Sequence, residues 1–440
     1  MASASFPAID FPFLAKVDIP RVRRVGLDHP RGTPVSDIAG SVRRAVRASR
    51  RLAALKPGAS VAVGLGSRGI SHIALIGREA IAELKAMGLF PFVVPAMGSH
   101  GGGTAEGQVK VLASLGMTED YLGAPIRATM EVVDYGVTAD GARCKFDRHA
   151  AAADAVLVIN RVKSHTTFDR PVESGLCKMV AVGLGKAEGA QQVHRIGPPG
   201  LSDTLPALAR LALQKSPVAY GIALVENAAK EMVRIEGVEP EDFFASDERL
   251  LVAAKALTAR LPFDPIDALV VEQIGKNISG AGMDHAVMGR ADLRSIPNPP
   301  PFVSRIAVLG LSKATGGNGL GIGLADFTTV GVVGQIDLQM IYMNSLTSTL
   351  VEKSRLPIVL PHDLDALRAT VSTSWSATDA ATRLCLIRST LHLDEILISE
   401  ALLPDLKASG RAGFIGDPFA LRFDETGALL TRAYAADETR

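Results

Sequence analysis

The segment ASVAVGLGSRG, residues 59–69, joins a short apolar run to a glycine-rich turn. The apolar run suits a buried strand, and residues 70–87, after the turn, repeat apolar side chains at helical spacing. A second apolar run at 89–94 leads into the glycine-rich loop 95–104, and a second helical pattern follows at 106–115. This alternation of strand, loop and helix predicts a parallel, doubly wound α/β sheet.

The chain is long enough for two domains. It has 440 residues, 47% of them hydrophobic, which exceeds what one ordinary core requires. Prolines and aspartates punctuate the sequence near 262–266, and a fresh apolar run begins at 268. We expect a larger N-terminal α/β domain with a mostly parallel sheet over 1–264, a smaller α/β C-terminal domain over 265–400, and a tail over 401–440 that packs back on the N-terminal domain.

Composition excludes several classes of function. The net charge is +1 and only 5% of residues are aromatic, so neither a nucleic-acid surface nor a stacking platform is expected. The basic run at 42–51 has helical spacing and is interpreted as the solvated face of a helix, with contact to nucleic acid or to an acidic ligand as the alternative. Residues 1–14 lack the pattern of a secretory signal, and no apolar stretch is long enough for a membrane span. We therefore expect a cytoplasmic protein without membrane contact.

The turn Gly64-Leu65-Gly66-Ser67-Arg68-Gly69 matches the GxGxxG pattern of dinucleotide-binding folds. That pattern requires an acidic residue at the end of the next strand to bind a ribose, and this strand ends at 93–96 without a carboxylate. Three interpretations of the turn remain: an NAD site, a plain tight turn, and a phosphate or carboxylate site that uses Arg68 and the helix N-terminus. The third is favoured.

Two further loops and one lysine carry candidate chemistry. His100 precedes three glycines, which let a backbone approach a ligand, and its imidazole suits general acid/base work. His165 lies in a basic polar loop after the apolar run 155–160. Lys178 lies in an apolar, glycine-flanked run, where an embedded amine needs either a partner charge or a covalent role. Because these loops follow strands, we expect them to converge on a cleft between the two domains.

Taken together, these residues resemble the nickel-dependent lactate racemases and the homologous 2-hydroxyacid racemases and epimerases. The resemblance covers roughly residues 55–340, and the order and spacing of its short motifs make it more specific than any one of them. The motifs that carry it are Met97–Gly102, His165, Gly175–Lys178 with His194, and Gln273 with Lys276.

The resemblance implies a nickel-pincer nucleotide, a nicotinate-derived mononucleotide whose ring holds nickel through one carbon and two sulfurs. Lys178 would tether it through a thioamide, and His194 would ligate the nickel. His100 and His165 would be the paired acid/base groups. The remaining implied contacts are to the cofactor from Gly66, Ser67 and Arg68, and to the substrate from Arg68, Gln273 and Lys276.

The implied chemistry is coherent for a small-molecule 2-hydroxyacid. A carboxylate stabilises a neighbouring carbanion poorly, whereas removal of hydride gives a flat 2-keto acid that can be reduced on either face. Each enantiomer then needs its own base for the hydroxyl proton, which explains two histidines. The family's lactate enzymes carry an acidic residue and a threonine before the arginine, where this chain has Leu65 to Ser67. A larger or differently substituted 2-hydroxyacid than lactate is therefore expected.

Two other functions stay open at this point. One is an NAD(P)-linked hydroxyacid dehydrogenase that uses the 64–69 turn. The other is a non-catalytic protein that stores or transfers the cofactor. The resemblance also implies dependence on a cofactor-biosynthesis system, and it leaves open whether the chain forms a homo-oligomer.

Overall fold

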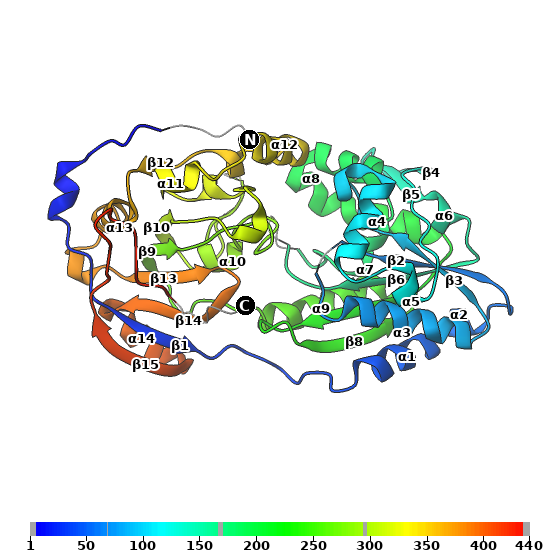
Figure 1. Cartoon of the computed structure of the whole chain (residues 1–440). Helices are drawn as coiled ribbons and strands as arrows, with labels where there is room; N and C mark the ends of the chain where they lie inside the picture. The colour runs from blue at the N-terminus through cyan, green and yellow to red at the C-terminus, as the bar shows by residue number, and fades with distance from the viewer. Residues whose placement is uncertain (1–5, 68, 166–169, 294–296, 434–440) are drawn as a thin grey trace. The chain divides into compact units, whose positions relative to one another are not determined.

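The chain folds into two units, shown in the computed structural model of Figure 1. The N-terminal unit is Pro30–Thr258, and the C-terminal unit combines Met1–His29 with Ala259–Arg440. The structure describes four stretches of chain: 6–67, 69–165, 170–293 and 297–433. Within them, the side chains at 194–196 and 198–202 are not described.

The N-terminal unit contains a five-stranded sheet with the order β3-β2-β6-β7-β8. The first four strands run parallel to one another, and β8 is antiparallel to β7. This arrangement confirms the predicted α/β class with a mostly parallel sheet. The bounds are β2 (Ser60–Leu65), β3 (Phe90–Pro95), β6 (Ala155–Arg161), β7 (Val218–Glu226) and β8 (Met232–Val238).

Both faces of this sheet are covered, which explains why its four parallel strands are apolar at most positions. Val61 and Val63 pack into a core shared with α1 and α3, whereas Ala62 points to the opposite core, shared with α8 and α9. A two-stranded hairpin, β4 (Val132–Val137) with β5 (Arg143–Asp147), lies outside the main sheet. The helices are α1 (Ile38–Arg47), α2 (Arg50–Ala53), α3 (Ile73–Ala86), α4 (Ala105–Ser114), α5 (Glu119–Leu122), α6 (Arg148–Ala151), α7 (Leu176–Lys178), α8 (Lys186–Lys215) and α9 (Phe243–Ala256).

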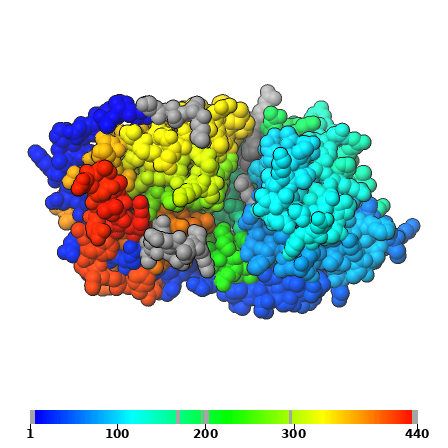
Figure 2. Space-filling model, viewed as in Figure 1, coloured from blue at the N-terminus to red at the C-terminus, as the bar shows by residue number. Residues whose placement is uncertain are grey.

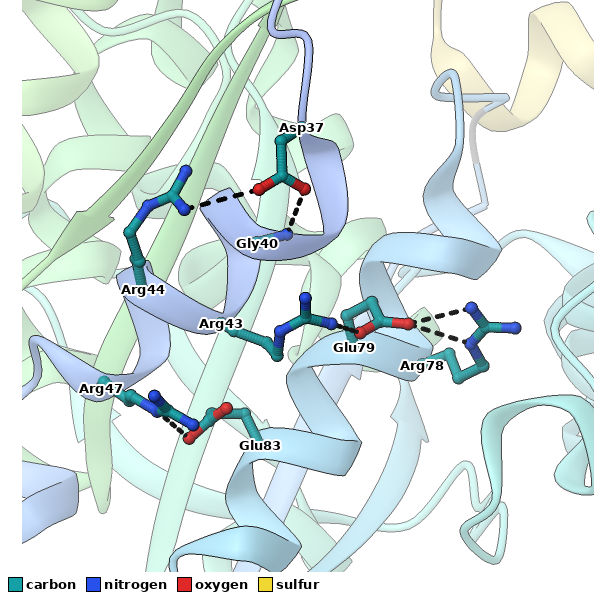
Figure 3. Close-up of polar contacts among 8 residues, drawn as sticks. All are labelled: Asp37, Gly40, Arg43, Arg44, Arg47, Arg78, Glu79 and Glu83. Carbon is teal, nitrogen blue, oxygen red and sulfur yellow. Dashed lines mark hydrogen bonds and ion pairs between the residues drawn. The ribbon is translucent and has the colours of Figure 1, made fainter.

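The basic run at 42–51 is helical except at Ala48 and Ser49, which separate α1 from α2, and its arginines meet carboxylates of their own unit. Arg43 and Arg47, one turn apart on α1, pair with Glu79 and Glu83, one turn apart on α3 (Figure 3). The Glu83 side chain is only 3% exposed, so the arginines neutralise carboxylates at the helix–helix contact. The run is thus part of the packing between two helices and not a purely solvated face.

The C-terminal unit contains an eight-stranded mixed sheet with the order β12-β11-β10-β9-β13-β14-β1-β15. The five strands from β12 to β13 are parallel, and β14, β1 and β15 continue the sheet in antiparallel fashion. The strands are β1 (Val22–Leu27), β9 (Ile266–Val271), β10 (Val303–Val308), β11 (Phe327–Thr329), β12 (Ile358–Leu360), β13 (Leu384–Ser389), β14 (His392–Ser399) and β15 (Ala412–Phe419). Its helices are α10 (His285–Met288), α11 (Val330–Val333), α12 (Leu338–Ser348), α13 (Asp363–Ser372) and α14 (Leu403–Ser409).

The two ends of the chain depart from the predicted domain bounds. Residues 1–29, expected in the N-terminal domain, belong to the C-terminal unit, because β1 pairs with β14 on one side and β15 on the other. The tail from 401 likewise belongs to the C-terminal unit, where its strand β15 pairs with β1. Figure 2 shows dark blue N-terminal atoms among the orange and red atoms of the C-terminal residues. None of the helices in the described stretches has the length and apolar character that a membrane crossing requires.

The place of β1 between β14 and β15 in the C-terminal sheet predicts a local effect on stability. Val25 is fully buried in the core of that unit, so Val25→Ala should lower its unfolding free energy by about 2 kcal/mol. Hydrogen exchange resolved by peptide should accelerate in 259–433 and stay unchanged in 30–258. Val351→Ala, at a half-exposed site in the same unit, is the matched control. Faster exchange confined to 30–258 would contradict the assignment of β1.

Candidate active site

Three loops of the N-terminal unit leave the same edge of its sheet. They follow β2 at Leu65, β3 at Pro95 and β6 at Arg161, and these strands are parallel. Because parallel strands end at one edge, the sequence-predicted residues Ser67, His100 and His165 are brought to it. The short helix α7, which ends at Lys178, follows the last of these loops.

The first two loops are joined by a hydrogen bond between the Ser67 hydroxyl and Nδ1 of His100. Ser67 is half-buried and His100 is exposed. Ser67 thereby fixes the orientation of the His100 imidazole ring. Arg68 lies outside the described residues, and Gly66 is half-buried beside Met179, whose Cε would be 3.3 Å from an added Cβ.

The backbone conformation of the loop explains why glycines flank His100. Gly98, Gly101, Gly102 and Gly103 all have φ between 59° and 69°, a region that other residues rarely adopt. A Cβ on Gly101 would also lie 2.5 Å from the backbone of Gly107. Packing inside the loop therefore requires glycine at position 101, apart from any ligand. Gly102, in contrast, faces open space.

A buried carboxylate holds the loop that carries His165. Glu173 accepts hydrogen bonds from the backbone N–H of His165 at 2.6 Å and of Arg170 at 3.1 Å, and it pairs with Lys255 at 2.6 Å. Burial raises the pKa of Glu173, and these donors oppose that shift. The Ser174 hydroxyl oxygen also accepts a hydrogen bond from the backbone N–H of Lys163 at 2.7 Å.

A second buried carboxylate holds the helix that carries Lys178. Asp247, on α9, accepts from the backbone N–H of Leu176 at 3.0 Å and of Cys177 at 2.8 Å. These are the first amides of α7, which lack partners inside the helix. A Cβ on Gly175, where φ is 89°, would lie 2.2 Å from Asp247, so the glycine is required for this contact. Burial raises the pKa of Asp247 to about 6.

The segment that carries Lys178, Cys177 and His194 is described only in part. Lys178 is half-buried at the end of α7, so its amine is not sealed in the core as the sequence suggested. His194 lies in the helix α8, but its side chain is outside the described residues. Cys177 is fully buried, and burial raises the pKa of its thiol, so it is not a reactive thiolate. The described residues contain no group of three or more His, Cys, Asp or Glu side chains placed to hold a metal.

Gln273 and Lys276 belong to the C-terminal unit, in the loop after β9. The backbone N–H of Gln273 donates to Arg388 O at 2.9 Å, and that of Lys276 donates to Thr315 Oγ1 at 3.0 Å. The Lys276 ammonium donates to Asn344 Oδ1 on α12. The loop is thus held by its own sheet, and Asn344 sets the direction of the lysine side chain.

Sequence reasoning missed the residues that support the site. Asp247 and Glu173 are buried carboxylates, and Lys186 is a fully buried lysine paired with Asp147. Only Asp247 could have been noticed from the sequence. It is a carboxylate at the helical spacing of the apolar, buried residues of 243–256. The end of β3, at Pro95 and Ala96, holds no carboxylate for a ribose, which weighs against the NAD interpretation.

The fold resembles that of a known racemase. It is similar to the lactate racemase apoprotein from Thermoanaerobacterium thermosaccharolyticum, with a TM-score of 0.51 and 12% sequence identity. The similarity covers 84% of this chain and 99% of that one. The chain therefore has a lactate racemase-like two-unit α/β fold. No protein-family model matches the sequence, and no curated protein matches it.

The raised pKa of Asp247 predicts a pH-dependent contribution to stability. Between its ordinary value of 3.8 and about 6, the native state binds the proton more readily than the unfolded chain, so the contribution of Asp247 falls as pH rises. The unfolding free energy of the wild type minus that of Asp247→Asn should fall by up to about 3 kcal/mol from pH 4 to pH 7. Chemical denaturation across this range measures it. A difference that rises with pH would contradict the assignment.

Proposed function

We propose that this chain is a racemase or epimerase of a 2-hydroxyacid that works with a nickel-pincer nucleotide. The observation that carries the proposal is the edge of the N-terminal sheet, where the loops of Ser67, His100 and His165 and the helix of Lys178 emerge together. The similarity in fold to a lactate racemase apoprotein supports it at the level of architecture.

The residues present fit the proposed cofactor. Lys178 offers a primary amine, half-buried at the end of a helix that Asp247 anchors, and an amine is what a thioamide tether requires. A Cβ on Gly69 or on Gly102 would meet no atom within 4 Å, so the described protein leaves room at the two glycine turns. His194 would supply an imidazole ligand of the kind that nickel accepts. When bound, this cofactor would take up the hydride of substrate carbon 2 and return it.

The chain's own residues would handle the hydroxyl proton and the substrate carboxylate. His100 would take the hydroxyl proton of one enantiomer and His165 that of the other. Each histidine would act as the acid when its own enantiomer is formed, which is general acid/base work suited to imidazole. Ser67 would keep the His100 ring oriented through Nδ1. Arg68 would bind the substrate carboxylate or the cofactor, together with Gly66 and Ser67. The roles of Gln273 and Lys276 in substrate binding stay predictions of the resemblance, as do the cofactor-biosynthesis partner and a cytoplasmic location.

The tether can be tested by mass. Full-length protein produced together with the cofactor-making system should carry a covalent adduct, and peptide mapping should place it on Lys178. Lys178→Arg should abolish the adduct and the bound nickel, because a guanidinium cannot form the thioamide. Lys215→Arg, at an exposed lysine on α8, should retain both. Wild-type protein with neither adduct nor nickel would sink the proposal.

The acid/base assignment can be tested by chiral separation of a panel of 2-hydroxyacids. For whichever acid the holoenzyme racemises, His100→Asn and His165→Asn should each lower kcat by about 100- to 10,000-fold. Both variants should keep the adduct on Lys178, because neither histidine is its attachment point. His149→Asn, in the same unit, serves as the control. Full activity in either variant would remove that histidine from the mechanism.

A further inference from the structure

Lys186 is a fully buried lysine for which the reaction itself has no use. It is the first residue of α8, has φ of 55°, and forms an ion pair with Asp147 at 2.9 Å in which both side chains are 0% exposed. It lies midway in the sequence between Lys178 and His194. A buried ammonium is costly unless it is paired and fully hydrogen-bonded, so its other contacts matter.

Those contacts lead to the loop that carries His100. The Lys186 ammonium donates to Pro95 O, at the end of β3, at 2.5 Å and to Gln108 Oε1 at 3.2 Å. Gln108 is itself fully buried, and its amide donates to Gly98 O at 2.8 Å and to His100 O at 3.4 Å. Asp147, Lys186 and Gln108 thus form one chain of polar contacts that ends on the backbone of His100.

The loop has little else within itself to hold it. Its glycines carry no side chains, and its internal backbone bonds run from His100 N–H to Met97 O at 3.2 Å, from Gly103 N–H to His100 O at 3.4 Å and from Thr104 N–H to Gly101 O at 3.5 Å. The bond from Gln108 to Gly98 is shorter than all three. A second short link, from Gly98 N–H to Gly183 O at 3.0 Å, joins the loop to the turn that follows Lys178.

We propose that Lys186 and Gln108 are positioning residues that fix the His100 loop relative to the segment bearing Lys178. This inference rests on the proposed function for its catalytic consequence, though not for its structural content. The Lys186 amine is enclosed by Asp147, Pro95 and Gln108, so its role is to orient and not to react. Misplacement of a reacting group by about 1 Å can cost about 100-fold in rate, which is the scale of effect that loss of this network should have.

The Gln108 variants test the proposal, because Lys186→Met would leave Asp147 buried and unpaired and could prevent folding. Gln108→Met keeps the length of the side chain and removes the amide. Gln108→Glu keeps an acceptor for Lys186 and loses the donor to Gly98 O. Lys110→Met, at an exposed position on the same helix, is the matched control.

In the full-length chain without cofactor, hydrogen exchange of the amides at 97–104 should accelerate about tenfold or more in both Gln108 variants. Exchange in the strands of the N-terminal sheet should match that of Lys110→Met. In the holoenzyme, kcat should fall about 10- to 100-fold while KM changes less than about threefold, since the loop places a proton-transfer group and does not add binding energy.

Each outcome decides a separate point. If exchange at 97–104 equals that of Lys110→Met, Gln108 does not hold the loop and the inference is wrong. If exchange rises while kcat stays unchanged, the loop is held but its position does not serve catalysis, which also overturns the inference. Absence of turnover and of the Lys178 adduct in the wild type would instead refute the proposed function. The exchange measurement would still decide whether the network fixes the loop.

Discussion

Strands that run in the same direction must end at the same edge of their sheet, and the candidate site depends on this constraint. In the N-terminal unit, β3, β2, β6 and β7 are parallel, so the segments after Leu65, Pro95 and Arg161 have to leave from one side. Residues nearly a hundred positions apart in the sequence, such as Ser67 and His165, are thereby gathered without any need for local contacts between them. The hydrogen bond between Ser67 and His100 forms because the loops after β2 and β3 leave the same edge.

Segments that leave such an edge need buried partners for their polar groups. In this chain, one buried charged side chain serves each of the segments that carry His165, Lys178 and His100. Glu173 binds the amides around His165, Asp247 binds those of the helix of Lys178, and Lys186 acts through Gln108 on the loop of His100. Removal of any one would leave a buried polar group unsatisfied, at a cost of about 1–3 kcal/mol or more. The same groups that stabilise the fold therefore determine where the candidate catalytic side chains lie.

The α/β class and the succession of strands in the N-terminal unit could be predicted from the sequence, because fully buried parallel strands are short apolar runs followed by glycine-rich turns. The place of β1 could not. Val22–Leu27 pairs with Ala412–Phe419, and no local pattern reports a partner at such a separation. The burial argument was also applied to the wrong lysine: Lys178 is half-buried, whereas Lys186, eight positions along, is enclosed with Asp147. Local apolarity cannot distinguish these two lysines, since the difference arises from the tertiary contact between α8 and β5.

We propose that the groups gathered at this edge serve hydride transfer at carbon 2 of a 2-hydroxyacid. The most direct test follows one enantiomer of an active 2-hydroxyacid, deuterated at carbon 2, through racemisation by the holoenzyme in ordinary water. If the hydride removed from carbon 2 returns to the same carbon, the opposite enantiomer, isolated by chiral separation and measured by mass spectrometry, should retain its deuterium. Replacement of the label by solvent hydrogen at the rate of racemisation would show that carbon 2 is deprotonated, and would contradict hydride transfer.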